Sequence, residues 1–362
     1  MSNKNFDPSA IAEKNGNYFG LPYLVEESEV VILPCPWDVT TSYSDGTSRG
    51  PQAILEASYQ LDFFSPFLEK AWDTKIGTLP FPQKILTLSR TLRKEAKSYI
   101  HFLEKGGAPE KNKAMKVRLE KINKKSETMH EQIEHSVKNL RKQGKKVILL
   151  GGDHSTSYGA IKAMADEFGA LSILHIDAHA DLRDSYEGFP HSHASIMFHA
   201  LGFSGVKSIT QVGIRDVSPD ELAIIKSNPK LKTFFDWDIK TKTMEGISWA
   251  KQCEAIVESL GQTVYLSFDI DGLDPKLCPH TGTPVPGGLE LEQILFLINL
   301  VIDSGRKLVG ADLVEVAPGP KGDEWDANVG ARALYQICQL LKKSSNPEYA
   351  LTHPRQRRSM AL

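Results

Sequence analysis

The sequence predicts an α/β protein, a three-layer α-β-α sandwich around a central, mostly parallel β-sheet. Short runs of apolar and β-branched residues recur along the chain, and a segment with helical spacing follows each run. Strands that are apolar on both sides are typical of a parallel sheet covered by helices on its two faces. Strands that alternate with helices are typical of the α/β class.

The expected strands lie, in chain order, at residues 30–33, 147–150, 172–176, 208–212, 263–268 and 307–313. The apolar run 294–302 predicts a buried helix, because a membrane-spanning helix needs ~20 apolar residues. A segment of about 84–146 is rich in Lys, Glu and Gln and is interrupted by Gly-Gly-Ala-Pro at 106–109. It predicts two solvated helices joined by a loop, and its lysines are interpreted as a solvated face.

Length and pattern predict one large domain. The chain has 362 residues, which allows two domains of ~150 residues, but large α/β folds often exceed ~250 residues as one unit. We expect an N-terminal arm at 1–27, a single domain at 28–341 that includes the helical accessory segment, and a C-terminal tail at 342–362. Both ends lack periodicity, and they are expected to pack on a neighbouring subunit or to fray.

Composition excludes several classes of protein. The 43 basic and 45 acidic residues give a formal net charge of −2, without the basic excess that a nucleic-acid partner requires. An apolar content of 41% excludes a disordered chain. The four cysteines form no Cys-x-x-Cys pair, and no secretory signal or membrane span is visible, so we expect a cytoplasmic protein without a membrane partner.

Metal-ligating residues follow three of the expected strands. The motifs are Gly-Gly-Asp-His-Ser at 151–155, Asp-Ala-His-Ala-Asp at 177–181 and Ser-Phe-Asp-Ile-Asp at 267–271. Alternation along an extended chain puts every second residue on one face, and the carboxyl ends of parallel strands are where ligands bind. Six candidate ligands should therefore converge: His154, Asp177, His179, Asp181, Asp269 and Asp271.

Four carboxylates and two imidazoles exceed what one metal ion usually takes, and without cations the carboxylates would repel one another. Two divalent ions that share carboxylates relieve this repulsion. Imidazole and carboxylate ligands without thiolates suit manganese, iron, cobalt or nickel. Two ions ~3.5–4 Å apart can hold a hydroxide as the nucleophile of a hydrolysis. A single Asp or His would more simply be a helix cap or a core residue, but the three motifs together favour a binuclear site.

These motifs, with Thr-Gly-Thr-Pro-Val-Pro-Gly-Gly at 281–288, resemble those of the ureohydrolases, the family of arginase and agmatinase, over about residues 28–341. The resemblance implies an arginase-like sandwich and a homotrimer or homohexamer. It also implies a binuclear manganese enzyme that hydrolyses a guanidino group and releases urea. The implied ligand sets are His154 with Asp181 on one metal and His179 with Asp271 on the other, with Asp177 and Asp269 bridging.

The resemblance also implies catalytic and substrate-binding roles. Asp181 would hydrogen-bond the nucleophile and relay its proton, and His193, in Ser-His-Ala-Ser, would shuttle protons to the departing amine. Many relatives have Gly where this chain has Ala194. Glu315 matches the guanidinium-binding glutamate, since a carboxylate pairs with a guanidinium through two parallel hydrogen bonds. Thr283 is the expected second substrate contact.

The loop 182–192 lacks the Ser- and Asn-bearing pattern with which arginases hold the amino-acid end of arginine, which disfavours arginine as the substrate. The segments around Trp37 and Trp325 depart from ordinary agmatinases and resemble a branch that includes nickel-dependent guanidine hydrolases. We therefore expect free guanidine, converted to urea and ammonia. The bulky aromatics could narrow or reshape the pocket, although a Trp more often serves packing than ligand binding. The alternative is an agmatinase, which forms putrescine and urea.

Two further alternatives stay open. The same scaffold could hydrolyse another amide or amidine bond, since a fold does not determine its substrate. The chain could also be a catalytically silent metal-binding subunit, although no expected ligand is missing. The sequence does not choose between manganese and nickel, because both accept this ligand set.

Overall fold

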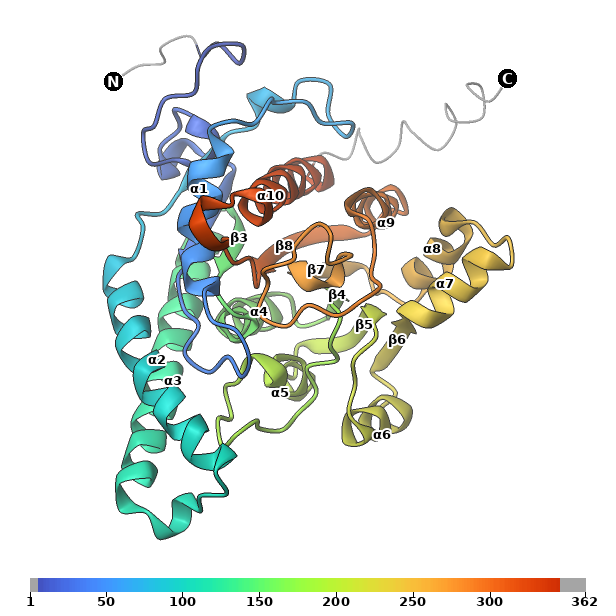
Figure 1. Ribbon diagram of the computed structural model, residues 1–362. Coiled ribbons are helices and arrows are strands. Elements are labelled where there is room, and N and C mark those ends of the chain that lie inside the picture. Colours follow the sequence, from blue (N-terminus) through green and yellow to red (C-terminus); the bar gives the residue numbers. More distant parts are fainter. Residues whose placement is uncertain (1–5, 346–362) are drawn as a thin grey trace.

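The computed structural model describes residues 6–345, which are built around one eight-stranded sheet with all strands parallel (Figure 1). The strand order is β2-β1-β3-β8-β7-β4-β5-β6. The strands are β1 Val30–Cys35, β2 Ile76–Thr78, β3 Lys146–Gly151, β4 Leu171–Ile176, β5 Val206–Ile214, β6 Leu231–Phe235, β7 Thr263–Asp269 and β8 Lys307–Val314. The predicted α/β class and parallel sheet are confirmed.

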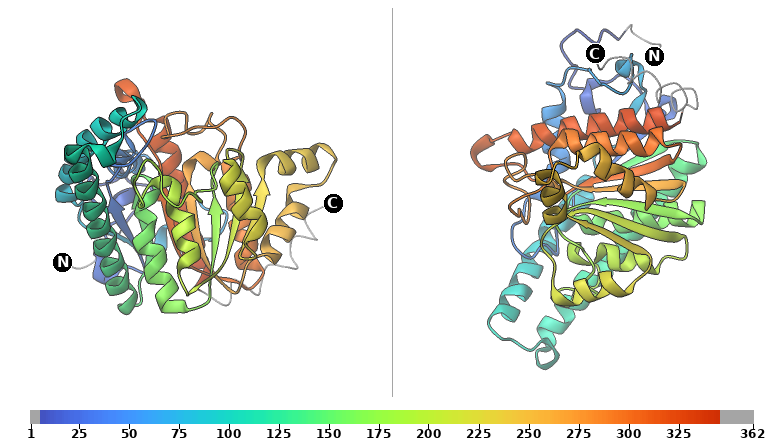
Figure 2. Two further views of the ribbon diagram at one scale, coloured as in Figure 1. Left: turned by 90° about the horizontal axis from the view of Figure 1, so that it is seen from below. Right: turned by 90° about the vertical axis from the view of Figure 1, so that its right-hand side faces the viewer.

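Helices cover both faces of the sheet and complete the three layers (Figure 2). The helices are α1 Gly50–Ser58, α2 Gln83–Glu104, α3 Lys113–Lys142, α4 Ser157–Phe168, α5 Ile196–Gly202, α6 Pro219–Ser227, α7 Asp236–Met244, α8 Trp249–Glu258, α9 Leu291–Asp303 and α10 Trp325–Ser344. One core is shared by the sheet with α1, α8, α9 and α10, and the other by the sheet with α2, α3, α4 and α5. Within residues 6–345, no helix is both long enough and apolar enough to cross a bilayer.

Strand β3 shows why the strands are apolar on both sides. Val147 and Leu149 point into the core under α2 to α5, whereas Ile148 and Leu150 point into the core under α1 and α8 to α10. All four side chains are buried. Because successive side chains of a strand point to opposite faces, a central strand covered on both faces has no polar alternation.

The sequence analysis missed the two edge strands, β2 and β6. Strand β2 has only three residues, Ile-Gly-Thr, and β6, Leu-Lys-Thr-Phe-Phe, is only partly buried. An edge strand pairs on one side and is often short or polar. Neither run therefore has the length or the apolar character that identified the central strands.

The Lys-rich segment forms the two expected helices, α2 and α3, which lie side by side and extend beyond the sheet (Figure 1). They are solvated on one face only. Leu92, Ala96 and Tyr99 of α2 and Ile122 and Met129 of α3 are buried. These residues recur at helical spacing, so the hairpin is part of the second core rather than a free appendage.

Part of the segment expected as an N-terminal arm lies within the same chain's core. Tyr18, Phe19 and Leu21 are buried, and the ring of Phe19 packs against Tyr335 of α10 with centroids 5.2 Å apart. Burial of such large rings contributes strongly to stability. Helix α10 runs through residue 344 of the expected tail, whereas residues 1–5 and 346–362 lie outside the described part. The division into arm, domain and tail stays a prediction.

Candidate active site

The candidate site lies where four neighbouring strands end. Strands β3, β8, β7 and β4 are adjacent in the centre of the sheet, and in a parallel sheet their carboxyl ends meet at one edge. The motifs at 151–155, 177–181 and 267–271 follow β3, β4 and β7, and Glu315 follows β8. All six predicted ligands are brought together there.

Three carboxylates surround one nitrogen of His154. The Nδ1 atom lies 3.0 Å from Asp181 Oδ2, 3.1 Å from Asp177 Oδ2 and 3.4 Å from Asp269 Oδ2. Although Nδ1 is buried, it makes no hydrogen bond of acceptable geometry, while Nε2 lies 2.9 Å from Ser267 Oγ. Ligand atoms ~2.1 Å from one cation at roughly right angles would lie ~3.0 Å apart, so this group fits a metal ion.

A second group forms around His179. Its Nδ1 atom lies 3.0 Å from Asp271 Oδ2 and 3.5 Å from Asp177 Oδ1. Asp177 thus turns one carboxylate oxygen toward each histidine, which is the geometry of a bridging carboxylate. Asp269 contacts His154 through Oδ2, and its Oδ1 accepts the N–H of Asp271 at 2.9 Å.

Backbone N–H groups aim these carboxylates. Asp177 Oδ1 accepts from His179 N at 2.6 Å, and Asp271 Oδ1 accepts from Ala178 N at 3.0 Å. The other oxygen of each carboxylate remains directed at a histidine. Asp181 has a positive φ of 54°, a conformation that costs a non-glycine residue energy and is concentrated at functional sites.

The pKa values reflect this crowding of charge. Burial raises the pKa of Asp269 well above its usual range, and the nearby charges of Asp271 and Asp177 raise it further. Burial and Asp177 raise the pKa of Asp181 to about 6. Burial opposes protonation of His154, but Asp177, Asp181 and Asp269 together raise its pKa well above its usual range. The site therefore attracts positive charge.

The sequence analysis missed His175, which joins the first group. Its Nε2 atom lies 2.7 Å from Asp177 Oδ2, and its Nδ1 lies 3.1 Å from Gln211 Nε2. His154, His175, Asp177 and Asp181 together have the spacing of a metal-binding cluster. Period-two alternation on β4 places His175 on the same face as Asp177, and this signal was available in the sequence.

Glu315 follows β8, contacts the backbone of His154 and is buried. Its Oε1 accepts the backbone N–H of His154 at 2.8 Å, whereas its buried Oε2 has no hydrogen-bond partner. Its φ is +63°. Gly282 borders Oε2, because a Cβ at that position would lie 3.3 Å from it. The Oε2 atom is thus an acceptor left free beside the turn that carries Thr283.

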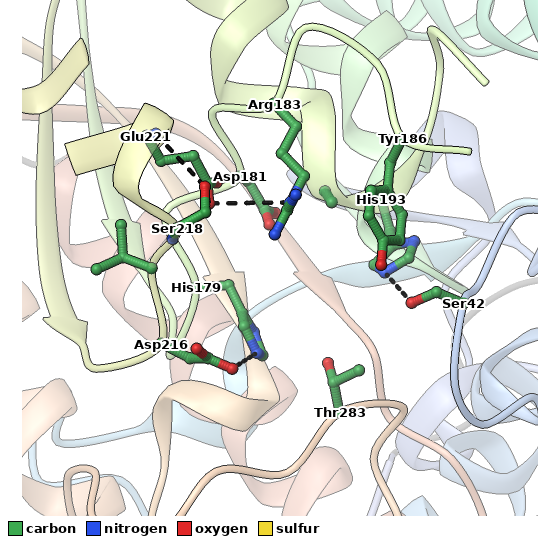
Figure 3. Close-up of a pocket in the computed structure, with 12 residues that line it drawn as sticks. Ser42, His179, Asp181, Arg183, Tyr186, His193, Asp216, Ser218, Glu221 and Thr283 are labelled. Carbon is green, nitrogen blue, oxygen red and sulfur yellow. Dashed lines mark hydrogen bonds and ion pairs between the residues drawn. The ribbon is translucent and has the colours of Figure 1, made fainter. Parts of the chain in front are cut away.

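His193 and Thr283 face the same cavity of about 160 Å³ (Figure 3). The ring of His193 lies 3.5 Å from Ser42 Oγ through Nε2 and 3.3 Å from Ser192 Oγ through Nδ1. Burial lowers the pKa of His193 to about 3. The cavity is lined by Ser42, His179, Asp181, Arg183, Tyr186, His193, Ala194, Asp216, Val217, Ser218, Glu221 and Thr283.

Neither Trp37 nor Trp325 narrows this pocket, so packing is the alternative that holds for them. Trp37 is fully buried in the core under α2 to α5, and Trp325 is 48% exposed at the start of α10. Neither side chain lines the cavity. Trp325 instead donates its indole N–H to the carbonyl of Lys276 at 3.0 Å, so both tryptophans serve packing.

Several known proteins are similar to this chain in sequence and in fold. The model of the arginase family matches residues 28–339. An N(1)-aminopropylagmatine ureohydrolase of Thermus thermophilus is 35% identical over 82% of this chain and 85% of its own length. An agmatinase of Bacillus anthracis is 32% identical over 81% of this chain and 85% of its own length. The structure of the agmatine ureohydrolase of Thermoplasma volcanium superposes with a TM-score of 0.67 at 24% identity, covering 90% of this chain and 94% of that one.

The site and fold define a hydrolase of carbon–nitrogen bonds with a cluster able to bind metal. The chain belongs to the arginase family, so the predicted ureohydrolase family and the predicted enzyme class are confirmed. The arginase-like sandwich is likewise confirmed. The individual roles of the ligand, catalytic and substrate-binding residues stay predictions.

Proposed function

We propose that this chain is a binuclear metal-dependent ureohydrolase, which cleaves a C–N bond of a small guanidino compound and releases urea. The observation that carries the proposal is Asp177, whose two oxygens face the separate groups around His154 and His179. A carboxylate shared in this way, next to His179 and Asp181 of the cavity wall, supports two cations side by side.

The six predicted ligands would hold two divalent ions, manganese or nickel. When bound, the ions would supply Lewis-acid activation of a water at neutral pH. Asp181, with its pKa raised to about 6 by burial and Asp177, could accept a hydrogen bond or a proton from that water.

Residues of the chain would bind and orient the substrate. The free Oε2 of Glu315 can accept a hydrogen bond from a guanidinium, and Thr283 lines the adjoining part of the cavity. Because burial lowers the pKa of His193 to about 3, its imidazole is neutral at neutral pH. It can accept a proton and return it to the departing amine.

For the substrate, we favour a guanidino compound with a cationic tail, such as agmatine or its aminopropyl derivative. The similar relatives bear the names of these activities. On the cavity wall, Asp216 presents a carboxylate that is 68% exposed, 4.0 Å from His179 Nε2. An exposed carboxylate at the cavity can pair with an ammonium group of the tail.

Free guanidine, the first expectation from the sequence, is the second candidate. The guanidinium of Arg183 lies over the ring of Tyr186 at 4.7 Å on the cavity wall. This cation would repel a cationic tail and so weaken the binding of a tailed substrate. It would weaken the binding of free guanidine less, because guanidine has no tail. The nearby carboxylate of Glu221, 3.8 Å from Arg183 Nε, offsets part of that charge.

One assay tests the proposal and separates the candidates. Protein loaded with manganese or with nickel would be tested for urea release from guanidine, agmatine, aminopropylagmatine, guanidinobutyrate and arginine. We expect turnover of a guanidino compound with an amine tail. Because an exposed ion pair contributes up to ~1 kcal/mol, the KM for that substrate should be ~2- to 5-fold higher in Asp216→Asn. Turnover of guanidine alone would favour the second candidate, and no urea from any of the five would overturn the proposed function.

A further inference from the structure

Residues 38–46, which we name the Asp38 loop, bring the chain from β1 to the cavity. The carboxylate of Asp38 closes the loop on itself, since its Oδ2 accepts the N–H groups of Gly46 at 3.0 Å and Ser48 at 3.2 Å. Within the loop, Ser42 lines the cavity and lies 3.5 Å from His193 Nε2. Figure 3 shows Ser42 facing His193.

Helix α2 of the accessory hairpin holds this loop from the other side. Ser89 Oγ donates to Asp38 Oδ1 at 3.2 Å and accepts the Asp38 N–H at 3.1 Å. One turn later, Arg93 Nη1 donates to the carbonyls of Val39 at 3.1 Å and Thr41 at 2.5 Å. Residues four apart lie on one helix face, so both side chains reach the loop together. The two carbonyls bracket Thr40.

Arg93 is buried, and carboxylates compensate its charge. Its Nε lies 3.8 Å from Asp45 Oδ2. Burial lowers the pKa of Arg93, while the charges of Asp38, Asp45 and Asp153 act in the opposite direction. Asp153 immediately precedes His154. A buried cation that lost these acceptors would be strongly destabilised, so the guanidinium and the loop backbone keep one geometry.

We propose that Arg93 is a positioning residue: by fixing the backbone at Val39 and at Thr41, the residue next to Ser42, it lets the Asp38 loop orient the imidazole of His193. The inference rests on the proposed function and gives the accessory hairpin a role in it. Metal binding and guanidinium binding should change less, because within residues 6–345 none of their candidate side chains hydrogen-bonds to Arg93 or to the Asp38 loop. Arg93 should therefore act on the proton-transfer step.

The positioning role of Arg93 can be tested with two variants, Arg93→Lys and Arg93→Met. Arg90→Lys is the control. Arg90 is exposed one turn earlier on the same helix. Lysine keeps the charge but not the planar guanidinium, whose Nη1 donates to both carbonyls. We expect kcat to fall ~10- to 100-fold while KM changes less than ~3-fold, metal content is unchanged, and Lys is less damaging than Met. Amides 39–46 should exchange hydrogen faster in both variants, and Arg90→Lys should match the wild type.

The other outcomes are equally decisive. Wild-type kcat and wild-type amide protection in Arg93→Lys and Arg93→Met would overturn the inference. So would a parallel loss of kcat, substrate affinity and metal, because it would show a general structural role. If the wild-type protein hydrolyses no guanidino compound, the proposed function fails. In that case, unchanged exchange at 39–46 in both variants would overturn the positioning of the loop, and faster exchange confined to 39–46 would support it.

Discussion

At the scale of single residues, Asp177 is the point on which both halves of the candidate metal site depend. One oxygen lies 3.1 Å from His154 and the other 3.5 Å from His179. The same carboxylate lies 2.7 Å from His175. These contacts join ligands that come from β3 and β4.

Replacing Asp177 by Ala should remove metal and turnover together. The bridging oxygens are lost, and His154 and His179 no longer share a carboxylate. We expect less than half of the wild-type metal per chain and a fall in kcat of at least ~10²-fold. Elemental analysis and urea release measure both. Asp184→Ala, an exposed change in the following loop, is the control, and full metal content with full activity in Asp177→Ala would contradict the two-metal site.

Replacing Glu315 by Gln separates substrate binding from metal binding. Gln keeps an oxygen that can accept the His154 N–H, which lies 2.8 Å from Oε1 in the wild type, but it loses the second carboxylate oxygen, Oε2, which has no hydrogen-bond partner and could accept from a guanidinium. We expect unchanged metal and a fall in kcat/KM of ~10²-fold or more. Steady-state kinetics and metal analysis check this against the exposed change Glu324→Gln. Loss of metal from Glu315→Gln would instead make this residue part of the metal site.

At the scale of elements, an aromatic cluster joins α3, α4, α5 and the loop before His193. His130 lies 4.9 Å from both Tyr158 and His191, measured between ring centroids, and His191 lies 5.5 Å from His199. Both ring nitrogens of His130 are buried without a hydrogen-bond partner. Burial, and then its histidine neighbours, lower the pKa of His130 well below 6.5, and the pKa of His191 falls to about 4 for the same reasons.

This cluster should make stability depend on pH. Below about pH 6.5 these histidines become protonated in the unfolded chain but stay neutral in the folded protein. The unfolded state therefore binds more protons, and the free energy of unfolding decreases as the pH falls. His130→Phe removes one such group without breaking a hydrogen bond. We expect its Tm to drop less than that of the wild type between pH 7 and pH 5, in thermal scans of metal-free protein. His135→Phe, an exposed change on α3, is the comparison, and equal drops in the wild type and His130→Phe would contradict the assignment.

The elements also show which parts of the fold a sequence can predict. The central strands and α9 were found because their apolar runs are long and buried on all sides. The edge strands β2 and β6 were missed because half-buried runs resemble loops. The ligand motifs were found because strand ends with acidic residues and histidines are local patterns. Ser42 and Arg93 carry no such pattern, because their positions depend on contacts between segments far apart in the chain.

At the scale of the whole molecule, four buried carboxylates at one sheet edge should make stability depend on metal. Bound cations relieve their repulsion only in the folded state. When the free metal concentration is ~100 times the Kd, metal binding raises the free energy of unfolding by ~2.7 kcal/mol. That corresponds to a rise in Tm of ~5 °C. Thermal scans with manganese, with nickel and with a chelator would measure this rise in Tm. Asp177→Ala should show a smaller rise than the wild type, and a wild-type Tm that no metal changes would contradict the prediction. Light scattering on the same samples would test the homotrimer or homohexamer that the sequence resemblance predicts.

The sequence by itself determined the α/β class, the parallel sheet, the ureohydrolase family and the convergence of six candidate ligands. The class and the sheet follow from apolar runs, the convergence of the ligands from strand ends and alternation, and the family from the resemblance of the motifs. All of these are local properties of the chain. Only the tertiary structure decided that both tryptophans pack away from the cavity, that His175 joins the first ligand group, and that Arg93 of the accessory hairpin holds the Asp38 loop. Each of these depends on where distant segments meet, because burial and side-chain contacts are set by packing across the whole fold.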